Sequence, residues 1–296
     1  MVSDATPPAA EDTERGRLVI SCRDQPGIVA AVSRLLFDSG ANIVHSDQHS
    51  TAARGGMFYM RLVFELPDLA GRRGALEHEI RKLADRFSMY WRVTDTGRRK
   101  RVAVFVSRDD HCLMELFWRQ QAGDLDADIA MIISNHPDLR EAVESRGIPY
   151  HHIPISRDTK ADAERQQLSL IAGKADLVVL ARYMQILTGD FVAAWPNQVI
   201  NIHHGLLPAF VGAAPYRQAH TRGVKLIGAT AHYVTADLDA GPIIEQDIER
   251  VSHGHGVDDM QRIGRYIERI VLARAVQWHV EDRVLVDGER TVVFAS

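Results

Sequence analysis

The segment Val199-Ile-Asn-Ile-His-His-Gly-Leu-Leu-Pro208 has the features of a short strand buried in a sheet. Its first residues are apolar except for one asparagine, and a glycine and a proline close the run. Because side chains alternate along a strand, Asn201 and His203 are expected on one face and His204 on the other. An amide and an imidazole at the end of a strand can together hold a carbonyl oxygen.

This strand is the fifth in a series of short apolar strands that alternate with helices, a pattern typical of a parallel sheet. The expected strands of the series are 102–106, 129–134, 150–155, 177–180 and 199–202, and the expected helices are 112–121, 138–146, 161–172 and 189–194. Later elements are a helix at 215–222, strands at 227–234 and 242–251, a long amphipathic helix at 258–280 and a hairpin within 284–294. The sequence therefore predicts an α/β domain over residues 102–296.

The chain before this domain shows a different order of elements. Strands are expected at 17–23, 42–48, 57–65 and 89–94, and helices at 28–39 and 75–87. The order βαββαβ predicts a ferredoxin-like domain over residues 16–96. Residues 1–15 are rich in alanine, proline and acidic residues and are expected to be a disordered tail. The basic run Gly97-Arg-Arg-Lys-Arg101 is expected to be a solvated linker.

Composition excludes several classes of function. The 296 residues carry a formal net charge of −4, which gives no electrostatic reason to expect a nucleic-acid partner. No apolar run approaches the roughly 20 residues of a membrane span, so no membrane association is expected. The two cysteines lie far apart, which favours a reducing cytoplasm over a disulfide framework.

The turn Asp24-Gln-Pro-Gly27 and the later Gly40-Ala-Asn-Ile43 resemble the ACT domain family, whose members sense small metabolites, usually amino acids. The resemblance implies an effector site that includes Asp24, Pro26, Gly27 and Asn42. A dimerisation or packing domain without a ligand remains the alternative, because a fold does not fix a function. ACT-like sheets pair with one another, so a homo-oligomer is expected.

Asp239 is the third polar group of interest. It lies in the turn-prone segment Asp237-Leu-Asp-Ala-Gly-Pro242, directly after an expected strand. Ligands of open α/β sheets bind beyond the ends of the strands, where a carboxylate can orient a water or a histidine. The alternative is that Asp239 only forms the turn, and the spacing of the residues does not decide between the two.

Several motifs in the right order resemble the folate-dependent formyltransferase family. They are Asn201-Ile-His-His, Leu207-Pro208, Gly212-Ala-Ala-Pro215 and Leu238-Asp-Ala-Gly-Pro242. The resemblance implies a Rossmann-like domain whose catalytic residues are Asn201, His203 and Asp239, acting on the formyl group of 10-formyltetrahydrofolate. It also implies that the pterin binds to the loop Met184, Gln185, Ile186 and Leu187, and that the enzyme holds no permanent cofactor.

Within this superfamily the chain is most similar to the formyltetrahydrofolate deformylases. The similar segments are Ser107-Arg-Asp-Asp-His-Cys-Leu113, Ser134-Asn-His-Pro-Asp138, Ala181-Arg-Tyr-Met-Gln-Ile-Leu187 and Ile227-Gly-Ala-Thr-Ala-His-Tyr233. The resemblance implies a hydrolase that converts 10-formyltetrahydrofolate to tetrahydrofolate and formate, in one-carbon metabolism and formate supply for purine biosynthesis. In the implied mechanism Asp239 positions and deprotonates water, while Asn201 and His203 stabilise the oxyanion. His203 then passes a proton to N10.

The loop after the first strand of the second domain favours a hydrolase over a transferase. Glycinamide ribonucleotide transferases hold a substrate phosphate with a glycine-rich loop there, whereas Ser107-Arg-Asp-Asp-His111 has two carboxylates and no glycine. The basic C-terminal domain of the methionyl-tRNA formyltransferases is also absent from this sequence. Two alternatives remain: a formyltransferase that uses a small amine acceptor, and a folate- or amino-acid-binding regulator without activity.

Four positions depart from the family's usual residues, namely Gly205, Leu206, Ala214 and Arg217. These departures bear on the rate and on the fit of the substrate. His232 is expected to pack near the site without acting in catalysis. No metal is expected, because His203-His204 and His253-Gly-His255 are not accompanied by a cluster at zinc-ligand spacing.

Overall fold

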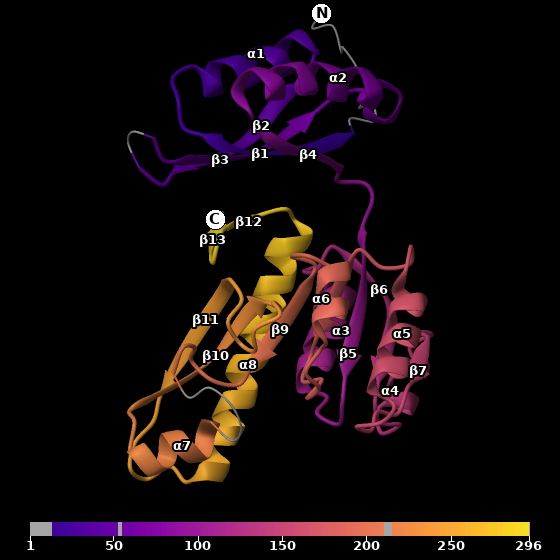
Figure 1. Cartoon of the computed structure of the whole chain (residues 1–296), viewed down its shortest axis with the longest axis vertical. Coiled ribbons are helices and arrows are strands. Elements are labelled where there is room, and N and C mark those ends of the chain that lie inside the picture. The colour runs from indigo at the N-terminus through magenta and orange to yellow at the C-terminus, as the bar shows by residue number, and fades with distance from the viewer. Residues whose placement is uncertain (1–13, 53–54, 210–214, 296) are drawn as a thin grey trace, which may run out of the picture. The chain divides into compact units, whose positions relative to one another are not determined.

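The computed structural model describes residues 14–52, 55–209 and 215–295. Most of the expected tail at 1–15 and the motif residues 212–214, which include Ala214, lie outside this range. The chain divides into two compact units, with the boundary between Arg98 and Arg99 (Figure 1). Each unit has its own sheet and its own apolar core.

The first unit is an antiparallel sheet of four strands with two helices on one face (Figure 1). Its elements are β1 (Arg15–Arg23), α1 (Ile28–Asp38), β2 (Asn42–Ser50), β3 (Met57–Glu65), α2 (Leu69–Phe87) and β4 (Tyr90–Asp95). The strand order is β2-β3-β1-β4, so the two consecutive strands β2 and β3 pair directly. The predicted order βαββαβ is confirmed.

The second unit is built on a sheet of seven strands in the order β11-β10-β9-β8-β5-β6-β7. Its strands are β5 (Lys100–Val106), β6 (Ala127–Ser134), β7 (Tyr150–His152), β8 (Leu177–Leu180), β9 (Val199–His203), β10 (Leu226–Tyr233) and β11 (Ile243–Arg250). The five strands from β7 to β9 are parallel, and β10 and β11 are antiparallel to their neighbours. The mostly parallel sheet predicted from the sequence is therefore confirmed.

Helices cover both faces of this sheet. They are α3 (His111–Ala122), α4 (Arg140–Glu144), α5 (Lys160–Ile171), α6 (Gly189–Ala194), α7 (Pro215–Arg222) and α8 (Val257–Val280), and a hairpin of β12 (Val284–Asp287) and β13 (Arg290–Val293) follows. Residues of β5 alternate between two cores: Val104 packs with α3 and α8, while Phe105 packs with α5 and α6. Strand β5 is apolar on both faces because helices cover both faces of the sheet and bury its side chains on each side.

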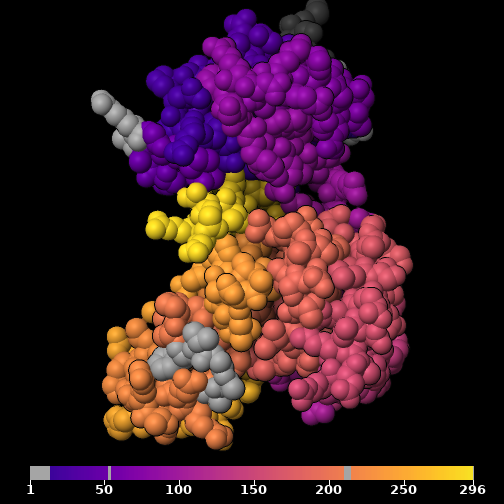
Figure 2. All heavy atoms as spheres, viewed as in Figure 1, coloured from indigo at the N-terminus to yellow at the C-terminus, as the bar shows by residue number. Residues whose placement is uncertain are grey.

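The sheet order separates the second unit into two sides. In Figure 2 the segments near residue 150 occupy one side and those beyond residue 215 the other, as the positions of β7 and β11 at opposite edges require. Strand β9 lies between them, next to the point where the sheet changes from parallel to antiparallel. No helix among the described residues is both long enough and apolar enough to cross a lipid bilayer.

Some boundaries differ from those expected. Helix α2 begins at Leu69, six residues before the expected start, because the Asp68 side chain caps it by accepting the Gly71 N–H. Strand β7 ends at His152, two residues before Pro154, which has no N–H to continue the ladder. Lys100 and Arg101 belong to β5 and not to a linker.

Candidate active site

Asn201 and His203 come from the last three residues of β9, and their partner strand is β10. The antiparallel register places His232 opposite Asn201 and Thr230 opposite His203. Asn201 is half-buried and His203 is buried, with 4% of its surface exposed. The sequence placed these two side chains on one face of a strand, and the structure adds His232 as their cross-strand neighbour.

His203 and Asp239 meet although 35 residues separate them in the sequence. The His203 Nδ1 atom lies 3.2 Å from the Asp239 Oδ2 atom. A carboxylate only accepts hydrogen bonds, so Nδ1 of His203 carries the hydrogen. The Nε2 atom of the same ring is buried and has no hydrogen-bond partner among the described residues. His203 therefore has one nitrogen held by the protein and one available for chemistry.

His232 orients Asn201. Its Nδ1 atom lies 2.9 Å from the Tyr233 carbonyl oxygen and donates to it, which leaves Nε2 as an acceptor. The Asn201 amide nitrogen lies 3.2 Å from that Nε2 atom and donates one of its two hydrogens. The second amide hydrogen remains for another acceptor. His232 is only 2% exposed and holds Asn201 in place. The sequence predicted that His232 packs near the site, but its contact with Asn201 depends on the strand register.

Asp239 is held ionised. The hydrogen bond from His203 keeps the pKa of Asp239 well below its usual range. The His232 Nε2 atom lies 3.7 Å from Asp239 Oδ1, which is longer than a hydrogen bond. The carboxylate is thus a fixed negative charge beside two imidazole rings.

The loop from 234 to 242 brings Asp239 back to the sheet. The Tyr233 N–H donates to the Pro242 carbonyl oxygen at 2.9 Å and closes the loop. Asp239 adopts a left-handed backbone conformation, with φ of 55°, which aspartate tolerates better than most residues. A Cβ on Gly241 would lie 1.8 Å from the Tyr233 carbonyl oxygen, so only glycine fits there.

Gly205 lies directly against the His203 imidazole. A Cβ at this position would lie 3.0 Å from His203 Nε2 and 3.5 Å from the Pro215 Cβ atom. The Gly205 carbonyl oxygen accepts a hydrogen bond from Thr230 Oγ1 at 2.8 Å, which fixes the backbone. At Gly205, where the chain departs from the family pattern, any side chain would therefore crowd the unpartnered nitrogen. Leu206 is half-buried, and Arg217 is exposed.

The loop expected to receive the pterin follows β8, the parallel neighbour of β9. Met184 and Ile186 are each 59% exposed, Gln185 is half-buried and Leu187 is buried. Two exposed apolar side chains on one loop are suited to contact a flat ring. The loop is anchored at Tyr183, whose carbonyl oxygen accepts a hydrogen bond from Ser107 Oγ.

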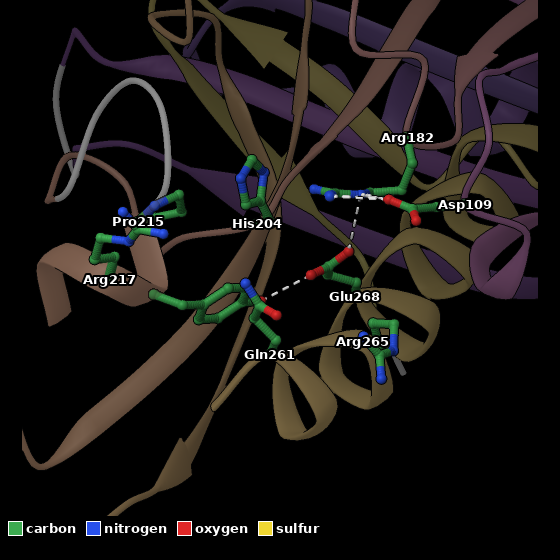
Figure 3. Close-up of a pocket in the computed structure, with 9 residues that line it drawn as sticks. Asp109, Arg182, His204, Pro215, Arg217, Gln261, Arg265 and Glu268 are labelled. Atoms are coloured by element: carbon green, nitrogen blue, oxygen red, sulfur yellow. Dashed lines mark hydrogen bonds and ion pairs between the residues drawn. The ribbon is translucent and has the colours of Figure 1, made fainter. Parts of the chain in front are cut away.

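A second group of charges lies beside His204. Asp109 accepts hydrogen bonds from Arg182 Nε at 3.2 Å and Nη2 at 3.1 Å. Glu268, which is 1% exposed, accepts from His111 Nε2 at 2.9 Å and from the Tyr216 hydroxyl at 2.7 Å. Figure 3 shows Arg182 between Asp109 and Glu268. The carboxylate of Asp109 is therefore already paired with a guanidinium, a feature that the sequence did not reveal.

These groups line a cavity of about 270 Å³ (Figure 3). Its wall consists of Asp109, Arg182, His204, Pro215, Tyr216, Arg217, Gln261, Arg265 and Glu268. Burial, and then the positive charge of Arg182, lower the pKa of His204 to about 4, so its ring is neutral at pH 7. Burial alone would raise the pKa of Glu268, but the hydrogen bond from His111 and the charge of Arg182 lower it to about 2.

His111, Cys112 and Glu268 form the one group among the described residues whose donor atoms are close enough to share a metal ion, within 4.8 Å of one another. Burial raises the pKa of the Cys112 thiol well above its usual range, so it is not a thiolate at neutral pH. The Arg182 Nε atom lies 3.5 Å from the same Glu268 carboxylate. A guanidinium beside the ligands opposes a cation, so these residues do not fit a metal.

The expected effector residues do not all lie together within one chain. Asp24 accepts a hydrogen bond from Ser50 Oγ at 2.5 Å, and Gly27 starts α1 with φ of 95°. Asn42 lies at the other end of β2, opposite Glu65. Asn42 and Ser50 are eight positions apart along β2, which corresponds to about 26 Å. Asn42 therefore cannot bind the same small molecule as Asp24 of its own chain.

Comparison with known proteins adds a second line of evidence. The model of the formyl transferase family matches residues 100–276, and that of the ACT domain family matches residues 16–77. The chain is 54% identical to the formyltetrahydrofolate deformylase of Bacillus subtilis (strain 168), over 95% of this chain and 94% of the relative.

Solved structures give the same picture. The crystal structure of a formyltetrahydrofolate deformylase from Pseudomonas syringae pv. tomato str. DC3000 has a TM-score of 0.90 at 49% identity, and covers 96% of both chains. Glycinamide ribonucleotide transformylase 1 from Symbiobacterium toebii has a TM-score of 0.62 at 30% identity, and covers 67% of this chain and 96% of the transformylase. The transformylase thus matches a smaller part of the chain.

Proposed function

The chain belongs to the formyltetrahydrofolate deformylase family, and from that premise we propose that it hydrolyses 10-formyltetrahydrofolate to tetrahydrofolate and formate. The reaction belongs to one-carbon metabolism and supplies formate for purine biosynthesis. The observation that carries the mechanism is the state of His203, whose Nδ1 is held by Asp239 while its Nε2 is buried without a partner among the described residues. The enzyme is a hydrolase in which water takes the place of an acceptor amine.

Asn201 supplies the first interaction with the formyl group. One amide hydrogen is engaged by His232, and the other donates to the formyl oxygen as negative charge develops on it. The His232 contact fixes the amide before the substrate arrives, so little reorganisation is needed in the transition state. Replacing such a donor typically reduces kcat by roughly 100- to 1,000-fold.

His203 and Asp239 act together as the proton-transfer pair. The resemblance to the family assigns deprotonation of water to Asp239 alone, but a carboxylate with a strongly lowered pKa is a weak base. We therefore assign the proton of the attacking water to His203 Nε2, with Asp239 holding Nδ1–H in place. The C–O bond forms, the C–N10 bond breaks, and the imidazolium returns the proton to N10 of tetrahydrofolate.

The pterin binds to the loop Met184, Gln185, Ile186 and Leu187. Its ring contacts the exposed side chains of Met184 and Ile186, and its polar edge contacts the backbone of the loop. The loop follows β8 and the formyl site follows β9, so neighbouring strand ends supply both halves of the folate site.

Replacement of Asp239 by asparagine tests the mechanism. Asparagine keeps the size of the side chain but loses the charge that fixes the His203 tautomer, so kcat should fall by roughly 1,000-fold or more. Affinity for 5-formyltetrahydrofolate, a stable analogue of the substrate, should change less than threefold, because the pterin loop is intact. Formate release and equilibrium binding measure the two quantities.

Asp237→Asn is the matched control, since Asp237 is an exposed residue of the same loop. It should release formate at the wild-type rate. Near-normal turnover of Asp239→Asn, or an equal loss in the two variants, would contradict the assignment of Asp239.

We further propose that the enzyme works in the cytoplasm as a homo-oligomer with an amino-acid effector at the ACT unit. Both cysteines, Cys22 and Cys112, are free and buried, which suits a reducing compartment. Strands β2 and β4 form the edges of the ACT sheet, and edges of this kind pair with other copies. Sedimentation with and without individual amino acids tests both the assembly and the effector.

A further inference from the structure

The cavity beside His204 has no part in folate binding as described above, yet it adjoins the reacting atoms. The rings of His203 and His204 are 5.5 Å apart between centroids, and His204 and Pro215 belong to the cavity wall. Gly205 packs against both residues, since a Cβ there would lie 3.0 Å from His203 Nε2 and 3.5 Å from the Pro215 Cβ atom. The cavity wall and the His203 ring are therefore close neighbours.

The charges of the cavity favour a small anion. Its wall carries three guanidinium groups, those of Arg182, Arg217 and Arg265, and two carboxylates, those of Asp109 and Glu268. His204 is neutral at pH 7 because its pKa is lowered to about 4. Three positive charges against two negative charges leave one net positive charge, and a monoanion would balance it.

Arg182 offers a hydrogen bond to such an anion. Its Nε and Nη2 atoms are engaged by Asp109, but its Nη1 atom is buried and has no partner among the described residues. In Figure 3 the far end of this guanidinium points toward the His204 ring. A buried guanidinium N–H without an acceptor costs free energy, and a carboxylate oxygen is its best acceptor.

We propose that this cavity binds formate, the small monocarboxylate that hydrolysis releases. The proposal rests on the proposed function, because only hydrolysis generates formate beside His203. Formate has three heavy atoms, so a volume of about 270 Å³ holds it together with several waters.

Inhibition by added formate tests the proposal. The full-length enzyme hydrolyses 10-formyltetrahydrofolate in sodium formate or in sodium chloride of equal ionic strength, and tetrahydrofolate formation is followed. Formate should inhibit specifically, and saturating folate should not relieve the inhibition, because the pterin loop is a different surface. Acetate and inorganic phosphate should inhibit more weakly, since they are larger or more highly charged.

Variants of the arginines locate the site. Arg182→Lys keeps a cation beside Glu268 but loses the fork of donors, and the inhibition constant for formate should rise by about tenfold or more. Arg265→Gln removes one exposed charge and should raise it by roughly threefold. Arg262→Gln is the matched control on the same helix, since Arg262 pairs with Asp259 outside the cavity and should leave the constant unchanged.

Failure of the proposed hydrolysis and failure of the formate site give different results. Failure of the wild-type enzyme to release formate would overturn the proposed function itself. An active enzyme whose inhibition constant is the same in wild type, Arg182→Lys and Arg265→Gln would overturn the formate site alone. Inhibition that saturating folate abolishes would also overturn it, since formate would then compete at the folate site.

Discussion

The adjacent residues His203 and His204 show how two neighbouring side chains acquire different chemistry. His203 has a carboxylate at one nitrogen and, among the described residues, no hydrogen-bond partner at the other, which is buried. His204 follows the last residue of β9 and lies against Arg182 and Tyr216. Burial and the cation beside it keep His204 neutral, so the pair does not place two positive charges side by side.

The neutral state of His204 makes stability depend on pH. Its folded pKa, about 4, lies below the ordinary value of 6.5, so the unfolded chain binds this proton first as pH falls. The stability associated with neutral His204 is fully present above pH 6.5 and is lost as pH falls toward 4. In His204→Gln the decrease in unfolding free energy between pH 7 and pH 4 should be smaller by about 3 kcal/mol.

Urea unfolding of wild type and His204→Gln at a series of pH values measures this difference. His204→Asn should behave in the same way, because it also lacks a titrating ring. Parallel pH profiles for the three proteins would show that His204 is not kept neutral by the fold.

At the scale of elements, the loop between β10 and β11 determines where Asp239 lies. Its closure requires a close approach of Gly241 to the Tyr233 carbonyl oxygen, and its turn requires a left-handed conformation at Asp239. The loop is therefore fixed by backbone packing at its two ends. The position of the carboxylate follows from these constraints.

Gly241→Ala should displace this loop, because its new Cβ would lie 1.8 Å from a backbone oxygen that cannot move without the strand. A shift of about 1 Å at Asp239 should lower kcat by roughly 100-fold. Binding of 5-formyltetrahydrofolate should persist, since the pterin loop follows a different strand. Steady-state kinetics and equilibrium binding test this, with the exposed neighbour Ala240→Ser as the control. Equal kinetics in the two variants would contradict it.

The elements differ in how well the sequence predicted them. Strands β3 and β8 and helices α6 and α7 have the expected bounds, because apolar runs with clear turn residues at their ends define them. Helix α2 starts earlier than expected because Gly71 and Gly74 interrupt its apolar pattern, while the cap at Asp68 still stabilises it. Local signals of this kind are strong only where capping and periodicity agree.

The candidate site was predictable only in part, because some of its contacts are local in the sequence and others are long-range. Alternation of side chains along β9 is a local property, and it predicted that Asn201 and His203 lie on the same face. The approach of Asp239 came from a family resemblance, since spacing gave no distance. The position of His232 opposite Asn201 and the pairing of Arg182 with Asp109 depend on strand register and on loop paths, which a single sequence does not contain.

At the scale of the whole molecule, the two units divide the work. The residues proposed for catalysis, folate binding and formate binding all belong to the unit from Arg99 onward. The apolar core of this unit is made from its own helices and strands. The first unit has a separate core and matches the ACT domain family, and its proposed role is regulatory.

A fragment of residues 99–296 should therefore fold and release formate from 10-formyltetrahydrofolate. It should no longer respond to any amino acid that changes the activity of the full chain. Circular dichroism establishes folding, and the formate assay with and without amino acids measures both properties. A folded fragment without formate release would show that the first unit is required for catalysis.

The pairing of β9 with β10 also determines when activity can appear. Asn201 and His232 are 31 positions apart, and helix α7 lies between them in the sequence, so their contact depends on long-range strand pairing. Long-range pairing of this kind comes late as a chain folds. A nascent chain, or one that has unfolded at this edge, lacks the oriented amide and the proton-transfer pair. Partly folded molecules therefore do not hydrolyse 10-formyltetrahydrofolate, and hydrolysis begins only when the sheet is complete.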